Sequence, residues 1–116
     1  MSTFYKWDDM PQAEMTPAIR LRPLGGQSVM AVEVTLDRGG IVAEHQHPHE
    51  QISLMISGKL EFTVGNEKKI VGPGEAVHIP PNVPHSVLVL ENTVVYDIFS
   101  PPREDFLTDE TPGYMK

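Results

Sequence analysis

Prolines and glycines interrupt the chain so often that no long helix fits between them. Eleven prolines and nine glycines fall among 116 residues, and a proline inside a helix removes a hydrogen bond and clashes with the preceding turn. Between these breaks, apolar and polar residues alternate, as with Met30, Val32, Val34 and Leu36 in the run 29–36. A period of two residues indicates a strand with one buried face.

Short runs of this kind recur along most of the chain. We expect strands at 19–22, 29–36, 52–56, 60–64, 68–71, 76–79, 86–90 and 93–99. The first is expected to be an edge strand that Pro23 ends, and Gly65-Asn66 is expected to form a hairpin turn. Six or more strands at a spacing of about eight to twelve residues predict an all-β sandwich or barrel.

A chain of 116 residues is expected to form one domain. Residues 1–18 contain Pro11 and Pro17 and show no regular period, so we predict an N-terminal arm with Trp7 as its anchoring aromatic residue. Residues 19–107 are predicted to form the barrel, with one helical turn near 104–107. Residues 108–116 are predicted to be a peripheral C-terminal tail.

The charge and composition exclude several classes of partner. The net charge is −7 and the isoelectric point is near 5.1, which argues against a nucleic-acid partner because such proteins carry a clustered basic face. The absence of cysteine excludes disulfides and thiolate metal ligands. The sequence shows no secretory signal and no apolar run near the roughly 20 residues of a membrane helix. We therefore predict a soluble, cytoplasmic protein without membrane contact.

The stretch after Gly39 carries the strongest functional signal. His45 and His47 are two positions apart, so on a strand both side chains leave the same face. Two neutral imidazoles on one face can bind one transition metal ion together. A mononuclear site typically has three or four protein ligands, and His85, which follows a proline-rich turn, is a candidate to complete it.

The two remaining histidines fit other roles better. His49 follows Pro48, which disturbs the strand phase, so we expect it beside the site or on the surface. His78 lies in an expected strand without a matching motif and is expected to be structural.

Fixed spacings of glycine, proline and histidine surround the candidate ligands. One set consists of Gly39, His45, His47, Gln51 and Gly58, and the other of the segments PGE (73–75), IPP (79–81) and PH (84–85). These spacings resemble the two motifs of the cupin superfamily. The resemblance implies a double-stranded β-helix barrel, often a dimer, with one metal ion held by two histidines and an acid of the first motif and a histidine of the second.

Gln51 departs from that pattern because it stands where cupins usually have glutamate. Three imidazoles and an amide oxygen leave the double positive charge of a metal ion uncompensated by the protein, so the ion should act as a Lewis acid on an anionic substrate. This argues against a metal-dependent dioxygenase, which we keep as an alternative. Such ligands suit Ni, Zn, Fe, Mn or Co without choosing among them.

A narrower resemblance rests on the segments HPHEQ, GPGE, IPPNVPH and DIFSPPREDFL. Together they resemble the KdgF family of pectin-degradation cupins, which is described as linearising 4,5-unsaturated monouronates. In that family a glutamine takes the fourth ligand place, so the resemblance implies His45, His47, Gln51 and His85 as metal ligands. It also implies Asp97 and Arg103 as catalytic residues, with Phe99 and Arg103 binding the substrate.

The residues themselves agree with these roles. Asp97 and Phe99 share one face of an apolar strand, where a carboxylate is costly unless it is paired or functional. The planar fork of Arg103 suits a substrate carboxylate. Asp97 has a second interpretation as a buried ion-pair partner of Arg103 or of another arginine.

Three functional hypotheses follow. The first is a metal-dependent enzyme that opens unsaturated monouronates to their keto forms, with a small anionic sugar acid as substrate. The second is a metal-binding cupin that only binds a small acid, which would need the arginine but no proton donor. The third is the dioxygenase. A homodimer, formed by exchange of the N-terminal arm at an open sheet edge, is also predicted.

Overall fold

The structure, a computed structural model, describes residues 3–107. It contains η1 (Trp7–Asp9), β1 (Ala13–Thr16), β2 (Ile19–Gly25), β3 (Met30–Leu36), β4 (Ile41–His45), β5 (Glu50–Val64), β6 (Glu67–Val71), β7 (Ala76–Ile79), β8 (His85–Ser100) and α1 (Glu104–Leu107). None of the helices in this part of the chain is long and apolar enough to cross a membrane. The predicted tail, 108–116, lies outside the described residues.

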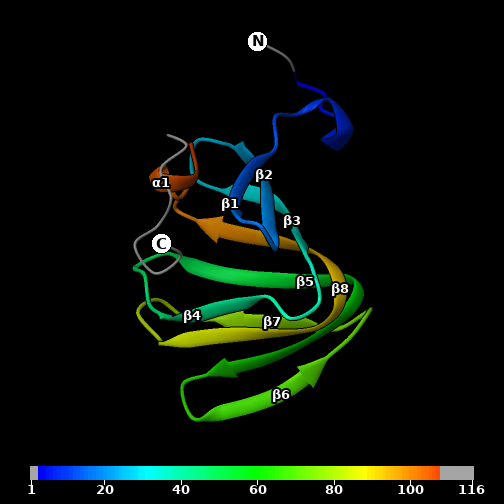
Figure 1. The fold of residues 1–116 in the computed structure, drawn as a ribbon. Helices are drawn as coiled ribbons and strands as arrows, with labels where there is room; N and C mark the ends of the chain where they lie inside the picture. Colours follow the sequence, from blue (N-terminus) through cyan, green and yellow to red (C-terminus); the bar gives the residue numbers. More distant parts are fainter. Residues whose placement is uncertain (1–2, 108–116) are drawn as a thin grey trace.

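Two long strands, β5 and β8, hold the fold together. All strand pairs are antiparallel, in the order β1-β2-β3-β8-β5-β6, with β4 also paired to β8 and β7 also paired to β5. β5 and β8 pair with each other along most of their length and bend across the molecule, so that β1, β2 and β3 lie at one end of Figure 1 and β6 at the other. The predicted all-β fold, a double-stranded β-helix barrel, is confirmed.

β5 and β8 are continuous, which corrects the prediction of separate strands at 52–56 and 60–64 and at 86–90 and 93–99. The chain bends at Gly58, whose φ of 89° is in the left-handed region that favours glycine. A Cβ atom there would lie 2.3 Å from the carbonyl oxygen of Asn92. Register shifts between Met55 and Leu60 absorb the bend, so pairing continues through it.

The barrel interior is built from the predicted alternation. Met30, Val32, Val34 and Leu36 are all buried, while the residues between them are partly exposed. Burying an aliphatic side chain of this size contributes roughly 1.5–3 kcal/mol. The inward face of β3 therefore forms part of the main core, as its sequence period predicts.

Part of the predicted N-terminal arm forms a strand of the sheet. β1 pairs with β2, and its Met15 lies in the core at 7% exposure. The prediction that 19–22 is an edge strand is therefore wrong, because β1 covers that side. Pro23 stays within β2, opposite Val32 of β3. The predicted anchor is present, since the Trp7 ring stacks on Tyr96 with centroids 5.7 Å apart.

Candidate metal centre

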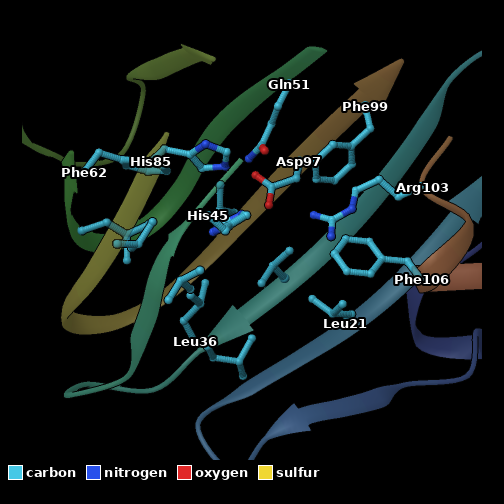
Figure 2. A pocket seen from close by; sticks show the side chains of 16 residues that line it. Leu21, Leu36, His45, Gln51, Phe62, His85, Asp97, Phe99, Arg103 and Phe106 are labelled. Carbon is cyan, nitrogen blue, oxygen red and sulfur yellow. The ribbon is translucent and has the colours of Figure 1, made fainter. Parts of the chain in front are cut away.

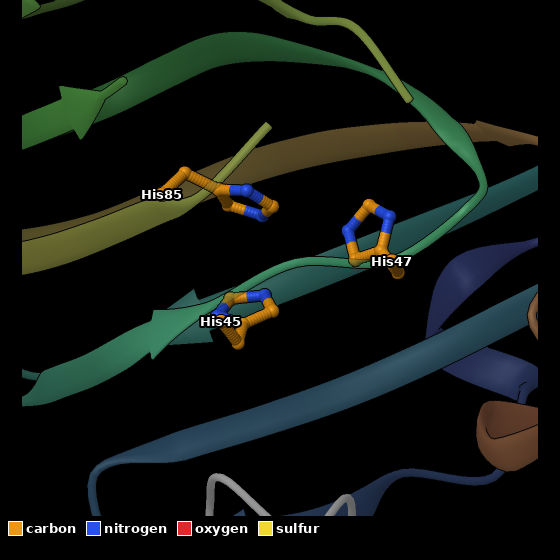
Figure 3. A group of neighbouring side chains, drawn as sticks. All are labelled: His45, His47 and His85. Carbon is orange, nitrogen blue, oxygen red and sulfur yellow. The ribbon is translucent and has the colours of Figure 1, made fainter. Parts of the chain in front are cut away.

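Three histidines from two segments of the chain meet inside the barrel. His45 ends β4, His85 begins β8, and the two are opposite each other in that strand pair. His47 follows in the loop after β4. One nitrogen from each ring lies within 4.8 Å of the others, and Figure 3 shows the three rings turned toward one another. The structure thus brings together three of the four predicted ligands in the spacing that one metal ion requires.

Backbone carbonyls fix which nitrogen of each ring carries the proton. The Nδ1 atoms of His45, His47 and His85 each lie 2.9–3.0 Å from a carbonyl oxygen. The acceptors are the carbonyl oxygens of Ala43, His49 and Val83. A carbonyl can only accept, so Nδ1 holds the proton and Nε2 presents its lone pair. Nε2 of His85 is buried without a hydrogen-bond partner, as expected of an atom that binds a metal ion.

The same surroundings keep the rings neutral. Burial is the main cause that lowers the pKa of both His45 and His47 to about 4. The pKa of His85 is also lowered, again mainly by burial. Neutral imidazole is the form that binds a metal ion.

Gln51 points its amide oxygen at this cluster. Its Oε1 lies 3.1 Å from Nε2 of His47, and its Nε2 donates to Oγ of Ser53 at 3.0 Å. With Nδ1 of His47 protonated, the two atoms at 3.1 Å are both acceptors, so their contact favours a cation between them. A set of three imidazoles and one amide oxygen therefore fits a transition metal ion.

Asp97 lies directly beside the amide. It is the pairing partner of Ser53 across β5 and β8, and the Ser53 hydroxyl donates to its Oδ1 at 2.6 Å. Burial raises the pKa of Asp97 to about 6, although the hydrogen bond from Ser53 and the charge of Arg103 partly oppose that shift. Figure 2 shows its carboxylate between the Gln51 amide and the Arg103 guanidinium. Such a carboxyl can both donate and accept a proton near neutral pH.

Arg103 is buried between two aromatic rings. Its guanidinium carbon lies 4.0 Å from the centroid of Phe106 and 5.3 Å from that of Phe99. Its Nε and Nη2 donate to the carboxylate of Asp105 at 3.2 and 2.7 Å. One edge of the predicted fork is therefore used within the protein.

A cavity of about 60 Å³ opens onto these groups. His45, Gln51, His85, Asp97 and Arg103 line it, together with Phe99 and aliphatic side chains of the barrel wall. The polar groups converge at one side of an otherwise apolar space, as Figure 2 shows. Sites that bind small molecules have this composition.

The two other histidines lie outside the ligand cluster. His78 is on the outer surface of β7, where its Nε2 lies 2.7 Å from a carboxylate oxygen of Glu50. His49 stands next to His47, with ring centroids 5.4 Å apart, and its carbonyl oxygen accepts from the His47 ring. His49 thus supports a candidate ligand through its main chain.

Comparison with known proteins agrees with this geometry. The family described as cupin domain matches residues 32–99. The pectin degradation protein KdgF of Dickeya dadantii (strain 3937) is 33% identical over 110 residues, which are 92% of this chain and 100% of that protein. The chain is a cupin of the KdgF family.

Solved cupin structures superpose closely on this one. KdgF from Halomonas sp. gives a TM-score of 0.85 at 33% identity, over 90% of this chain and 99% of that chain. An RmlC-like cupin from Shewanella frigidimarina gives 0.86 at 26% identity, over 91% of this chain and 96% of that chain. The barrel and its long bent strands are thus shared with proteins of nearly the same length.

Sequence reasoning missed three residues of this cupin's site. Ser53 is two positions after Gln51 on the same buried face of β5. A small polar residue on a buried face needs a hydrogen-bond partner, and this could have indicated its role. Asp105 and Phe106 lie in α1, just after Arg103. A helical turn there brings the residue three positions on, Phe106, back toward the arginine, which could have indicated that contact.

Proposed function

We propose that this cupin is a metal-dependent enzyme that opens the ring of 4,5-unsaturated monouronates and yields the keto form. The observation that carries the proposal is Asp97, a partly buried residue whose carboxyl has a pKa of about 6, in the same cavity as His45, His85 and Arg103. The relative from Dickeya dadantii is named for pectin degradation. Pectin is a polymer of uronic acids, so a small uronate is a substrate that suits this site.

The ligands of the proposed metal ion are His45, His47, Gln51 and His85. Their donor set suits a divalent transition metal ion such as Ni, Zn, Fe, Mn or Co. A bound ion would supply a Lewis acid that polarises a substrate oxygen. All four ligands are neutral, so they leave the charge of that ion available to an anionic substrate.

Arg103 and Phe99 are proposed to hold the substrate. The guanidinium carries a positive charge at the cavity wall, and its contacts with the rings of Phe106 and Phe99 hold it there. A uronate carboxylate would be attracted to that charge within a partly apolar space, where screening by water is weak. Phe99, at 2% exposure, packs edge-on against His47 and so forms a rigid wall of the site.

Asp97 is proposed to move the proton. Ring opening breaks the bond between the anomeric carbon and the ring oxygen, and the anomeric hydroxyl loses its proton to become an aldehyde. The ring oxygen remains on the double bond as an enol. Tautomerisation then adds a proton to C4 and leaves a ketone at C5, so the overall reaction is an isomerisation. A carboxyl that titrates near pH 6 suits both the removal and the delivery of that proton.

The proposal is tested by following the ultraviolet absorbance of the double bond, which is conjugated with the substrate carboxylate. The metal-loaded protein should remove this absorbance, and Asp97→Asn should lose most of the activity while still binding metal. A wild-type rate no faster than that of Asp97→Asn would overturn the enzymatic assignment. Tight binding of the uronate without turnover would instead identify a small-acid binder.

We also propose that residues 19–107, with β1 added to their sheet, form the functional barrel and that two copies associate. All candidate site residues lie within that range. The outer face of β5 exposes Ile52, Leu54 and Ile56 at 41%, 38% and 47%, and a second copy could cover them. Size-exclusion chromatography at several concentrations should show a dimer, and a monomer throughout would refute the association.

A further inference from the structure

We propose that Ser53 is a positioning residue, which fixes the atom of the Gln51 amide that faces the three histidines. This inference rests on the proposed role of Gln51 as a metal ligand. An amide side chain has a carbonyl oxygen at one end and an NH₂ group of nearly the same shape at the other. Only the oxygen can bind a metal ion, so a group that distinguishes the two ends controls the site.

The location of Ser53 allows it to act in this way. Its side chain is fully buried, on the same inward face of β5 as Gln51. On its other side it is the direct pairing partner of Asp97 in β8. The hydroxyl therefore contacts both the amide, at 3.0 Å, and the carboxylate, at 2.6 Å. The amide also lies close enough to the carboxylate to lower the pKa of Asp97 through a hydrogen bond.

The positions of the protons determine which group donates in each of the two hydrogen bonds of Ser53. When it is ionised, the Asp97 carboxylate can only accept, so the single proton of the Ser53 hydroxyl points to it. The side of Oγ that faces Gln51 then offers a lone pair, which needs a donor. The NH₂ end of the amide is the only end that donates, so Oε1 is turned to His47, 3.1 Å away.

The reverse orientation would be unfavourable at both ends. It would place the amide oxygen against a hydroxyl oxygen whose proton is already used, and it would direct N–H groups toward the ion. Burial makes an unmatched polar contact costly, because neither group can turn to water for a partner. Mutation of a residue that orients a metal ligand through a hydrogen bond typically changes the metal affinity by roughly 10- to 100-fold.

The test is a metal-binding titration with Zn²⁺ in competition with a chromophoric chelator. Ser53→Ala should weaken binding by roughly 10- to 100-fold relative to wild type. Ser57→Ala is the matched control, because Ser57 is on the same strand but exposed, and it should bind as wild type does. Thermal unfolding of the metal-free variants checks that Ser53→Ala is folded.

A double-mutant cycle separates orientation from a general effect on the barrel. A glutamate at position 51 has two equivalent oxygens, so no group needs to orient it. In a Gln51→Glu background, Ser53→Ala should therefore change the Zn²⁺ affinity by no more than about twofold. A change of that size is common between mutations that do not interact. An equal loss in both backgrounds would show that Ser53 only supports the fold and would overturn the inference.

The remaining outcomes are also decisive. If wild type binds Zn²⁺ and Ser53→Ala binds it equally well, the positioning role is wrong while the metal site stands. If wild type itself binds no metal ion, the proposed function fails and the role of Ser53 fails with it. Ser53→Thr, which keeps the hydroxyl, should recover part of the affinity lost in Ser53→Ala if the hydroxyl is responsible.

Discussion

His45 and His85 face each other across the β4–β8 pair, with ring centroids 4.2 Å apart. They are far apart in the sequence, but main-chain pairing holds them side by side before any ion binds. Their Nδ1 atoms are fixed by the carbonyl oxygens of the residues two positions earlier, Ala43 and Val83. Little side-chain freedom is therefore lost on metal binding, which favours high affinity.

Removal of one of these rings should abolish tight metal binding. At a metal concentration of 100 times the dissociation constant, binding stabilises the folded protein by about 2.7 kcal/mol. We expect wild type to gain this stability from the metal ion and His85→Ala to gain almost none. The measurement is the free energy of unfolding with and without metal, from urea titrations.

His78→Ala is the control for this prediction. His78 is an exposed histidine on β7, paired with Glu50 and outside the cluster. It should leave the stabilisation by metal unchanged. Equal stabilisation of His85→Ala and wild type would contradict the assignment of His85 as a ligand.

Acid should destabilise the metal-free protein. In the folded state the pKa values of His45 and His47 are about 4, below the ordinary value of 6.5, so the unfolded chain binds protons first as the pH falls. Their contribution to stability is fully present above about pH 6.5 and is lost toward pH 4. His85 shifts in the same direction. The urea midpoint after chelator treatment should be lower at pH 5 than at pH 7.

Asp97 opposes this trend without reversing it. Its pKa is raised from 3.8 to about 6, so the folded state binds its proton first, and its contribution is present below the ordinary value and lost as the pH rises through 6. One carboxyl acts against three histidines, so stability should still fall on acidification. His47→Gln should flatten the pH dependence, and an unchanged slope in that variant would contradict the assigned cause.

Much of the barrel could be predicted because its signals are local. The alternation of Met30, Val32, Val34 and Leu36 with small or polar residues indicates which face of the strand is buried. The spacing of His45 and His47 indicates that both rings lie on one side of the chain. The continuity of β5 could not be predicted in this way. In the sequence, Gly58 indicates the end of one strand and the start of another. In the structure, pairing with β8 continues on both sides of Gly58, so the strand bends there and does not end.

The site was harder to predict where its contacts depend on neighbours from other segments. The pairing of Ser53 with Asp97 is a matter of register between β5 and β8, which no local pattern specifies. The contacts of Arg103 with Asp105 and Phe106 are local by comparison, since these residues are only two and three positions further along the chain.

The aromatic face of Phe106 should matter for substrate binding. The Arg103 guanidinium lies 4.0 Å from its ring centroid, and such a contact contributes about 0.5–2 kcal/mol. Phe106→Leu keeps an apolar side chain in this buried position but removes the aromatic face. We expect the KM for a monouronate to rise by about 2- to 30-fold, the equivalent of that energy, with metal affinity unchanged.

A double-mutant cycle with Arg103→Ala identifies the cause. If Phe106 acts by holding the guanidinium, Phe106→Leu should add little to the defect of Arg103→Ala. Fully additive effects would show that Phe106 contributes by packing in the core instead, since it is itself buried at 5% exposure.

Gly58 should be the glycine whose replacement the fold tolerates least. Gly58 and Gly39 have nearly the same backbone angle, with φ of 89° and 87°, so alanine at either site meets a similar conformational cost of about 1–2 kcal/mol. A Cβ atom at Gly39 would meet nothing within 4 Å, whereas one at Gly58 would lie 2.3 Å from both the Asn92 carbonyl oxygen and the Thr93 hydroxyl. Gly58→Ala should therefore lose about 1–3 kcal/mol more than Gly39→Ala in urea unfolding. It should also reduce metal affinity, because the bend at Gly58 joins the two halves of β5 and sets how Gln51 faces His85. Equal losses of stability in the two variants would show that the close approach of β8 to the bend does not constrain it.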